Sequence, residues 1–229
     1  MNNDYAFVEP FIEHQGEGRA FWLRKPREIG EKLLIARKGF PVPECHRNKA
    51  VIFLDFRSAF GTGGHGTTEG CLIALQKIIR GGESLLDAGT GTGILAIAAC
   101  KLGAGRITAI DIDRAACTET RKNTALNGIE KRIVVMEGGI QSVKDPFDII
   151  VANLRTHILV ELADDLVHKT RAGAIMIFSG ILERELPSFL SFLKRYPLEL
   201  LEIIRIHGWM TLVLTIGNDI SGKESLDLK

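Results

Sequence analysis

Hydrophobic positions from Ser84 onward follow two alternating periods. Short apolar runs typical of strands alternate with stretches in which apolar residues recur every three or four positions, as on one face of a helix. This alternation is typical of βαβ units and predicts a parallel sheet with helices between its strands. The predicted strands are 84–88, 106–111, 132–136, 147–152 and 173–179, and the predicted helices are 67–80, 93–102, 114–127, 156–170 and 182–194.

The two ends of the chain depart from this alternation. Before residue 60, short apolar pieces stand between charged, Pro-containing stretches, which indicates a small β-rich segment. At the other end, 198–206 and 209–216 indicate two strands joined by a tight turn at His207-Gly208, with no helix between them. The early pieces are Ala20–Leu23, Lys32–Ala36 and Ala50–Asp55.

An α/β fold with a doubly wound, mostly parallel sheet that ends in an antiparallel hairpin is expected of the Rossmann-like class I methyltransferase fold. A dinucleotide-binding half would instead continue with another crossover helix. We therefore expect a small β-rich N-terminal segment at 1–56, a methyltransferase domain at 57–220 and a polar tail at 221–229.

Composition restricts the class of function. The 229 residues carry a net charge of +1 and are 45% hydrophobic, so the chain can bury a full core but shows no broad cationic face for nucleic acid. The four cysteines lack paired CxxC spacing, and we expect reduced thiols. No stretch approaches the roughly 20 apolar residues of a membrane span, and the N-terminus lacks a signal-peptide pattern. We therefore expect a cytoplasmic protein that binds neither nucleic acid nor membrane, in an oligomeric state that the sequence leaves open.

The most informative motif is Leu85–Gly93, where a predicted strand ends and a helix begins. Glycines let backbone approach a ligand closely, and the helix N-terminus offers unpaired N–H groups to an anionic group. The candidate cofactor-binding residues here are Asp87, Gly89, Gly91 and Gly93. Gly91-x-Gly93-x-x-Ala96 also satisfies the loose dinucleotide pattern, and a tight turn without a ligand is the less favoured alternative.

Polar residues also end two further predicted strands. Asp111 stands about 20 residues beyond the glycines, where doubly wound folds place a carboxylate against ribose hydroxyls. Asp113 fits the N-cap of the following helix. Asn153 ends the fourth strand, where its amide can accept a hydrogen bond from a substrate amine and donate one to a cofactor. An ordinary loop or cap residue is the alternative for Asn153.

A glycine-dense loop, Ala59–Glu69, precedes the first predicted helix of the sheet domain. Thr67 fits the N-cap of that helix, and Glu69 suits its first turn. The loop could fold over a bound cofactor with Phe60 or threonine hydroxyls facing it. A flexible loop without this role is equally compatible with the residues.

Five segments together resemble the PrmA family, whose members methylate amino groups of large-subunit ribosomal protein eleven. The resemblance runs from about Val51 to about Ile216, and its most specific part is the Phe-Gly-Thr-Gly-x-His-x-Thr-Thr loop. It implies the class I fold, S-adenosylmethionine as cofactor, S-adenosylhomocysteine as product and a protein acceptor, for which a ribosomal protein is one candidate. It also implies that Phe60, Thr67, Gly89, Asp111 and Asn153 surround the cofactor. The segments are Phe60–Thr68, Asp87–Ala99, Ile110–Asp113, Val151–Leu154 and Ser179–Leu182.

The chain departs from the family pattern near the expected substrate entrance. The family has Pro where this chain has Gly66, and its Asn-Ile-Leu-Ala segment is Asn153-Leu154-Arg155-Thr156 here. Family members also carry a separate N-terminal domain that grips the ribosomal protein, whereas about 60 residues precede the loop here. We therefore expect that domain to be shortened or missing, and the departures leave the acceptor's identity open.

Methyl transfer from a sulfonium is an in-line displacement that depends mainly on positioning the nucleophile. We predict that Asn153 is the catalytic residue and orients an acceptor amine, either a lysine side chain or an N-terminus. His65 could act as a general base, but a hydrogen bond that braces its loop is favoured. The histidines form no metal-ligand spacing, and we predict no metal.

Three other functions fit parts of the pattern. A small-molecule methyltransferase of the same fold is the main alternative. A nicotinamide-dependent oxidoreductase would share the glycine turn and the acid after the next strand, but it would leave Asn153 and the terminal hairpin unexplained. A non-catalytic module would bind the cofactor without turnover.

Overall fold

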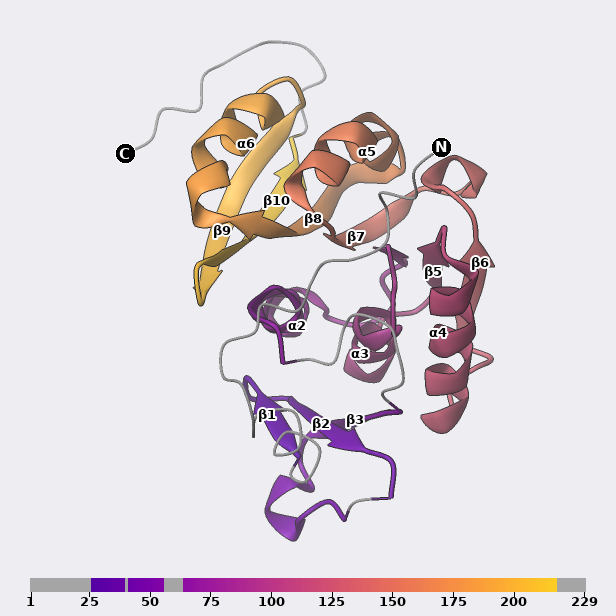
Figure 1. Cartoon of the computed structure of the whole chain (residues 1–229). Helices are drawn as coiled ribbons and strands as arrows, with labels where there is room; N and C mark the ends of the chain where they lie inside the picture. Colours follow the sequence, from indigo (N-terminus) through magenta and orange to yellow (C-terminus); the bar gives the residue numbers. More distant parts are fainter. Residues whose placement is uncertain (1–25, 40, 56–63, 218–229) are drawn as a thin grey trace.

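The computed structural model describes residues 26–39, 41–55 and 64–217. Its main feature is a seven-stranded sheet in the order β6-β5-β4-β7-β8-β10-β9 (Figure 1). Neighbours from β6 to β8 run parallel, and β10 is antiparallel to both β8 and β9. The strands are β4 (Leu85–Ala88), β5 (Ile107–Asp111), β6 (Ile133–Glu137), β7 (Phe147–Asn153), β8 (Thr170–Leu182), β9 (Leu198–Ile206) and β10 (Trp209–Ile216).

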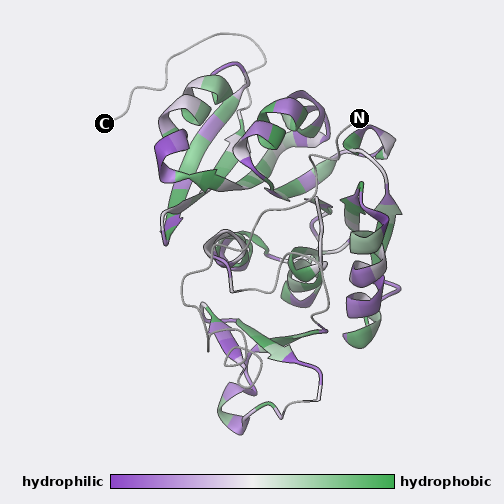
Figure 2. Ribbon diagram, viewed as in Figure 1, coloured by the Kyte–Doolittle hydropathy of each residue, from purple (hydrophilic) through white to green (hydrophobic). Residues whose placement is uncertain are grey.

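Helices cover both faces of this sheet, as the apolar runs on its central strands require (Figure 1). Figure 2 shows that the strands and α3 are largely hydrophobic, whereas α4 carries many hydrophilic residues. One face carries α2 (Gly66–Ile78), α3 (Ile94–Leu102) and α4 (Arg114–Leu126), and the other carries α5 (Thr156–His168) and α6 (Leu186–Leu193). Short 3-10 turns are η1 (Glu44–His46), η2 (Ile140–Ser142) and η3 (Glu183–Glu185).

A second, three-stranded sheet packs on the outer side of α2 and α3 (Figure 1). It consists of β1 (Arg27–Ile29), β2 (Leu33–Arg37) and β3 (Ala50–Leu54), with β1 antiparallel and β3 parallel to β2. Its apolar residues share one core with α2, α3 and the near face of the large sheet. A second core lies between the far face and the helices α5 and α6. The two helices α2 and α3 are therefore buried between two sheets.

The α/β fold class predicted from the sequence is confirmed, including the terminal hairpin. His207 and Gly208 both have positive φ, 49° and 76°, as in the type I′ turns that favour two-residue hairpins. The predicted helix 182–194 begins too early, because β8 continues to Leu182 through its pairing with β10 and η3 follows before α6. The strand β1 was not predicted, and Ala20–Leu23 lies outside the described residues.

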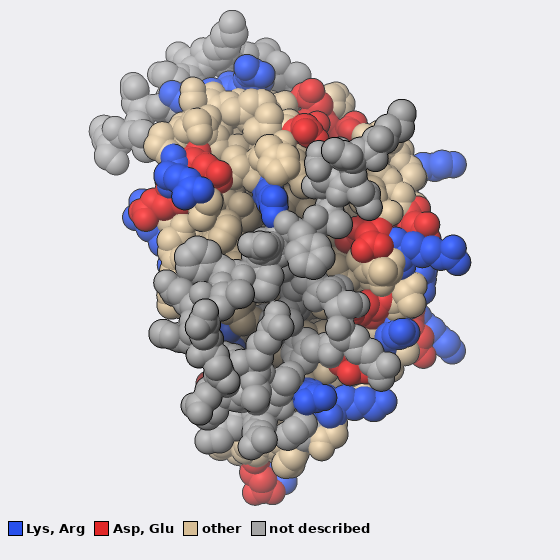
Figure 3. All heavy atoms as spheres, in the orientation of Figure 1, with Lys and Arg blue, Asp and Glu red and all other residues tan. Residues whose placement is uncertain are grey.

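The surface carries charges of both signs. On the face in Figure 3, basic and acidic side chains of the described residues lie interspersed near the margins of the view. None of the helices among the described residues is long and apolar enough to cross a bilayer.

Candidate active site

Three parallel strands deliver the predicted site residues to one edge of the large sheet. The last residues of β4 are paired in register with β5 on one side and with β7 on the other. Gly89 directly follows β4, whereas Asp111 and Asn153 end β5 and β7. Because these strands are parallel, the three residues lie at the same carboxyl edge, where ligands of open α/β sheets bind.

The glycine loop between β4 and α3 requires its glycines. Gly89 has φ +74°, and a Cβ atom on it would lie 2.5 Å from Cδ2 of Leu154. Gly93 has φ +81° as the N-cap of α3, and a Cβ there would lie 2.8 Å from Cγ2 of Thr120. Left-handed φ values are costly for residues with a Cβ. The loop therefore presents bare backbone beside the edge of the sheet.

Asp111 connects this loop to the neighbouring strand. One carboxylate oxygen accepts a hydrogen bond from the Gly91 N–H at 3.0 Å, and the other accepts from the Asp113 N–H at 3.0 Å. Asp113 caps α4, as predicted, by accepting from the Ala115 N–H at 2.8 Å. The half-buried Asp111 carboxylate is thus fixed in place while its remaining lone pairs can accept further hydrogen bonds.

Asp87 is a fully buried acid beneath the same loop. Its Oδ2 accepts from the Thr90 hydroxyl at 2.7 Å and from the Ala96 N–H at 3.1 Å. Among the described residues, its Oδ1 has no hydrogen-bond partner. Burial raises the pKa of the Asp87 carboxyl to about 7. Buried polar atoms without a partner are rare in folded proteins, so Oδ1 of Asp87 is unusual among the described residues.

Asn153 is held by a residue of α2. Its Nδ2 donates to Oγ1 of Thr68 at 3.3 Å, and Thr68 is fully buried. With the amide in this orientation, no described residue donates to its Oδ1. The Leu154 N–H donates to the carbonyl of Ser179 at 3.0 Å, which fixes the chain just beyond the strand. The side-chain carbonyl of Asn153 is therefore positioned to accept a hydrogen bond from a ligand.

The N-terminus of α2 differs from the prediction. The prediction that Thr67 is the N-cap is wrong, because α2 begins at Gly66 and its N-cap is His65. The Thr67 N–H donates to Nδ1 of His65 at 3.4 Å, and the Thr67 hydroxyl hydrogen-bonds to the same nitrogen at 2.9 Å. Burial lowers the pKa of the His65 imidazole, which favours the neutral ring that this acceptor role requires. The ring also lies 4.9 Å, centroid to centroid, from that of Trp209.

Two further residues, Thr68 and Ile112, belong to this edge. The sequence does not distinguish Thr68 from Thr67 as the residue that faces the site. Adjacent helix positions differ in direction by about 100°, and apolar periodicity does not resolve that difference there. Ile112 is 59% exposed between two acids at the end of β5. The sequence does contain a signal for Ile112, because a large apolar residue stands there between two acids at the end of a predicted strand.

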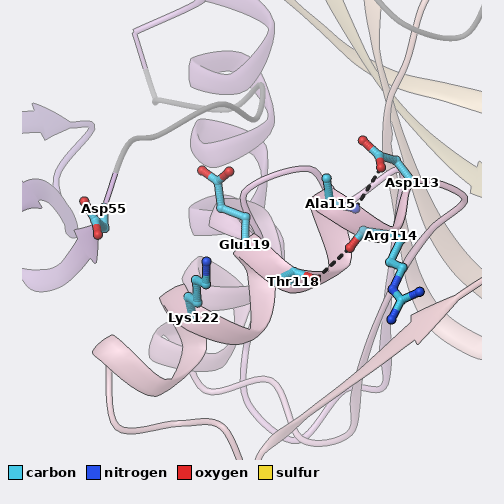
Figure 4. A pocket seen from close by; sticks show the side chains of 7 residues that line it. All are labelled: Asp55, Asp113, Arg114, Ala115, Thr118, Glu119 and Lys122. Carbon is cyan, nitrogen blue, oxygen red and sulfur yellow. Dashed lines mark hydrogen bonds between the residues drawn. The ribbon is translucent and has the colours of Figure 1, made fainter.

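A cavity of about 600 Å³ adjoins the site at the start of α4. Figure 4 shows that Glu119 and Lys122 project from α4 on the side where Asp55 lies at the end of β3. Asp113 lines the cavity at its other end, two residues beyond Asp111. The cavity therefore extends from the acid-rich end of β5 toward the small sheet.

The structure brings together most of the predicted site residues, and their roles toward a ligand stay predictions. Those at this edge are Asp87, Gly89, Gly91, Gly93, Asp111 and Asn153. Thr67 lies in the adjoining first turn of α2, with its side chain turned to His65. Phe60 lies outside the described residues. No group of three or more potential metal ligands occurs within 26–39, 41–55 and 64–217.

Comparison with known proteins agrees with this geometry. The sequence model of the family "Ribosomal protein L11 methyltransferase (PrmA)" matches residues 19–216. A protein of that name from Caldicellulosiruptor saccharolyticus is 40% identical over 192 residues, which are 82% of this chain and 62% of that protein. One from Halalkalibacterium halodurans is 32% identical, over 95% of this chain and 69% of that protein.

A solved structure is also similar. The ribosomal protein L11 methylase of Lactobacillus delbrueckii subsp. bulgaricus superposes with a TM-score of 0.79 at 30% identity, covering 84% of this chain and 98% of that one. The chain spans 62% and 61% of the length of two Caldicellulosiruptor relatives. The family match nevertheless covers most of the chain, including the whole of the site described above. The chain belongs to the ribosomal protein L11 methyltransferase family.

Proposed function

We propose that this chain is an S-adenosylmethionine-dependent protein methyltransferase that acts on lysine or N-terminal amines, with a ribosomal protein as acceptor. The observation that carries the proposal is the position of Asn153. Thr68 holds its amide at the same sheet edge as the glycine loop and the Asp111 carboxylate. An amine acceptor and a cofactor would therefore meet at one place. A ribosomal acceptor would also place the reaction in the cytoplasm.

The residues at this edge fit S-adenosylmethionine. The Asp111 carboxylate can accept from ribose hydroxyls, and the exposed Ile112 beside it offers apolar surface to a flat base. The absence of a Cβ on Gly89 lets the loop backbone lie directly against Leu154, the residue that follows Asn153. Because Asp87 is fully buried, its unpartnered Oδ1 suits a water that bridges to an ammonium group.

The residues of this chain can favour transfer to an amine without acid–base chemistry of their own. When bound, S-adenosylmethionine would supply a sulfonium methyl group, whose carbon bonds to the nitrogen of a neutral amine as the C–S bond breaks and S-adenosylhomocysteine leaves. A lysine amine has an ordinary pKa of about 10.4 and must lose a proton before it attacks. The side-chain amide of Asn153 can accept a hydrogen bond from the amine and orient it. Because the amide is neutral, it does not stabilise the ammonium form in the way that a negatively charged carboxylate would.

Calorimetric titration of the purified protein with S-adenosylmethionine tests the cofactor. We expect binding that Asp111→Ala weakens about 10- to 100-fold, because hydrogen bonds to a charged group are lost. Asp113→Ala is the matched control, since it removes the neighbouring carboxylate and the cap of α4. That variant should lose about 1 kcal/mol of unfolding free energy and keep most of its affinity. NAD should not bind.

Transfer of a labelled methyl group to purified ribosomal protein L11 then tests the acceptor. Asn153→Ala should retain cofactor binding in large part and lose most of the transfer rate, because it no longer orients the amine. A folded wild-type protein that binds no S-adenosylmethionine would contradict the proposed activity. A protein that binds it and methylates only small molecules would contradict the proposed acceptor.

A further inference from the structure

Side chains on one face of α4, which lies outside the sheet, form hydrogen bonds with the backbone of the glycine loop. The Thr120 hydroxyl donates to the carbonyl of Gly91 at 2.9 Å, and Nδ2 of Asn123 donates to the carbonyl of Thr92 at 2.9 Å. Thr120 and Asn123 are both buried. Helix positions three apart lie on the same face, so α4 fixes two consecutive carbonyls of the loop.

The amide of Asn123 also holds the end of the small sheet. Its Oδ1 accepts from the Asp55 N–H at 3.1 Å, just after β3. A single buried side chain therefore bonds both the glycine loop and the chain that leaves β3, which are far apart in the sequence.

Asn127, the C-cap of α4, makes a related contact, which involves the small sheet but not the glycine loop. Its Oδ1 accepts from the Phe53 N–H at 3.0 Å, and its Nδ2 donates to the Phe53 carbonyl at 2.7 Å. The same Nδ2 donates to the carbonyl of Asn123 within its own helix. Asn127 thus joins β3 to α4, whereas Asn123 joins β3 to the glycine loop.

We propose that Asn123 is a positioning residue for cofactor binding, which holds the glycine loop in its binding conformation by fixing the Thr92 carbonyl against the end of β3. This inference rests on the proposed function, in which the loop contacts S-adenosylmethionine. The asparagine acts through the loop and need not touch the cofactor.

The physical reason is the backbone freedom of the loop. Gly91 and Gly93 have φ values of 56° and 81°, and glycine has more alternative conformations than any other residue. If the loop left its present conformation, the buried amide of Asn123 and the carbonyl of Thr92 would each lose a partner. Without this hydrogen bond, cofactor binding would have to order the loop, which lowers affinity.

The substitution Asn123→Asp distinguishes the contact with the small sheet from the contact with the glycine loop, because it keeps the first and removes the second. When ionised, the carboxylate can still accept from the Asp55 N–H, but the side chain no longer offers a donor to the Thr92 carbonyl. Asn127→Asp is the matched control, because it places the same charge on the same helix beside β3 and leaves the contacts of the glycine loop in place. Asn123→Ser, which is neutral and too short to reach both groups, replaces the first variant if Asn123→Asp does not fold.

The measurement is calorimetric titration with S-adenosylmethionine, together with thermal unfolding. We expect both aspartate variants to have a lowered Tm, but only the Asn123 variant to have a Kd raised about tenfold. The Asn127 variant should stay within about twofold of the wild type. Equal Kd values for the two variants, whether both unchanged or both raised, would overturn the inference. A wild-type protein that fails to bind would instead contradict the proposed function.

Discussion

The substitution Asp87→Asn should remove a pH dependence from the free energy of unfolding. Burial of this fully enclosed carboxyl raises its pKa from 3.8 to about 7, despite hydrogen bonds from Thr90 and Ala96 that favour the charged form. In the unfolded chain the pKa returns to about 3.9. Between these two pH values the folded state holds the extra proton, so its contribution to stability is full below pH 4 and is lost as the pH rises through 7.

The size of this pH-dependent change in stability follows from the pKa shift of Asp87. About three pKa units correspond to about 4 kcal/mol of stability lost between acid and neutral pH. The asparagine of the variant would keep a carbonyl oxygen for the donors Thr90 and Ala96, but its NH₂ group would take the position that has no partner, at a cost of about 1–3 kcal/mol. The variant should therefore be less stable than the wild type near pH 4 and more stable near pH 8.

Urea unfolding of the cofactor-free proteins between pH 4 and pH 8 measures this difference. The lowered pKa of His65 adds stability as the pH rises through its ordinary range, but that contribution is common to both proteins and cancels. The two curves of unfolding free energy against pH should cross. A difference between them that stays constant with pH would refute the assignment of a raised pKa to Asp87. In the wild type, cofactor affinity should also increase as the pH rises through about 7, because the ionised carboxylate attracts an ammonium group.

Two glycine substitutions test the packing around the site. Gly89→Ala should lower the free energy of unfolding by about 1–2 kcal/mol, because φ is +74° and the new methyl meets Leu154; urea unfolding measures the loss, and an unchanged midpoint would contradict it. Gly70→Ala should also destabilise, by about 1 kcal/mol, although alanine favours a helix. Its methyl would overlap the Thr211 hydroxyl, which hydrogen-bonds to Ser179 at 2.7 Å. The double variant with Thr211→Ala should recover part of that loss.

The residues at the sheet edge could be predicted from the sequence, because the features that place them there are periodic patterns or contacts between residues close in the sequence. Strand periodicity and interleaved helices predict parallel strands, and parallel strands bring their carboxyl ends together. Asp111 and Asn153 therefore came to one edge as expected, and Asp113 caps α4 through a contact only two residues away. The hairpin turn at His207-Gly208 is local in the same sense.

What the sequence pattern missed depends on contacts between distant segments. The Asn123 and Asn127 side chains look like ordinary polar positions of a helix, yet they bond residues 68 and 74 positions away. The extension of β8 to Leu182 follows from pairing with Trp209, which no property of the segment 180–182 alone indicates. Capping by His65 depends on a ring nitrogen that burial keeps neutral, so the hydroxyl preference that favoured Thr67 did not apply.

These distant contacts give the small sheet a part in shaping the site. Arg27 of β1 forms an ion pair with Glu69 of α2, and α2 also carries Thr68, which holds Asn153. At its other end the small sheet bonds Asn123 of α4, which holds the glycine loop. Both helices that position the predicted cofactor and acceptor residues are therefore tied to the same three strands. A change that breaks both of these ties, the Arg27–Glu69 ion pair and the hydrogen bond from Asp55 to Asn123, should disturb both halves of the site together, whereas a change in α5 or α6 should disturb neither through this route.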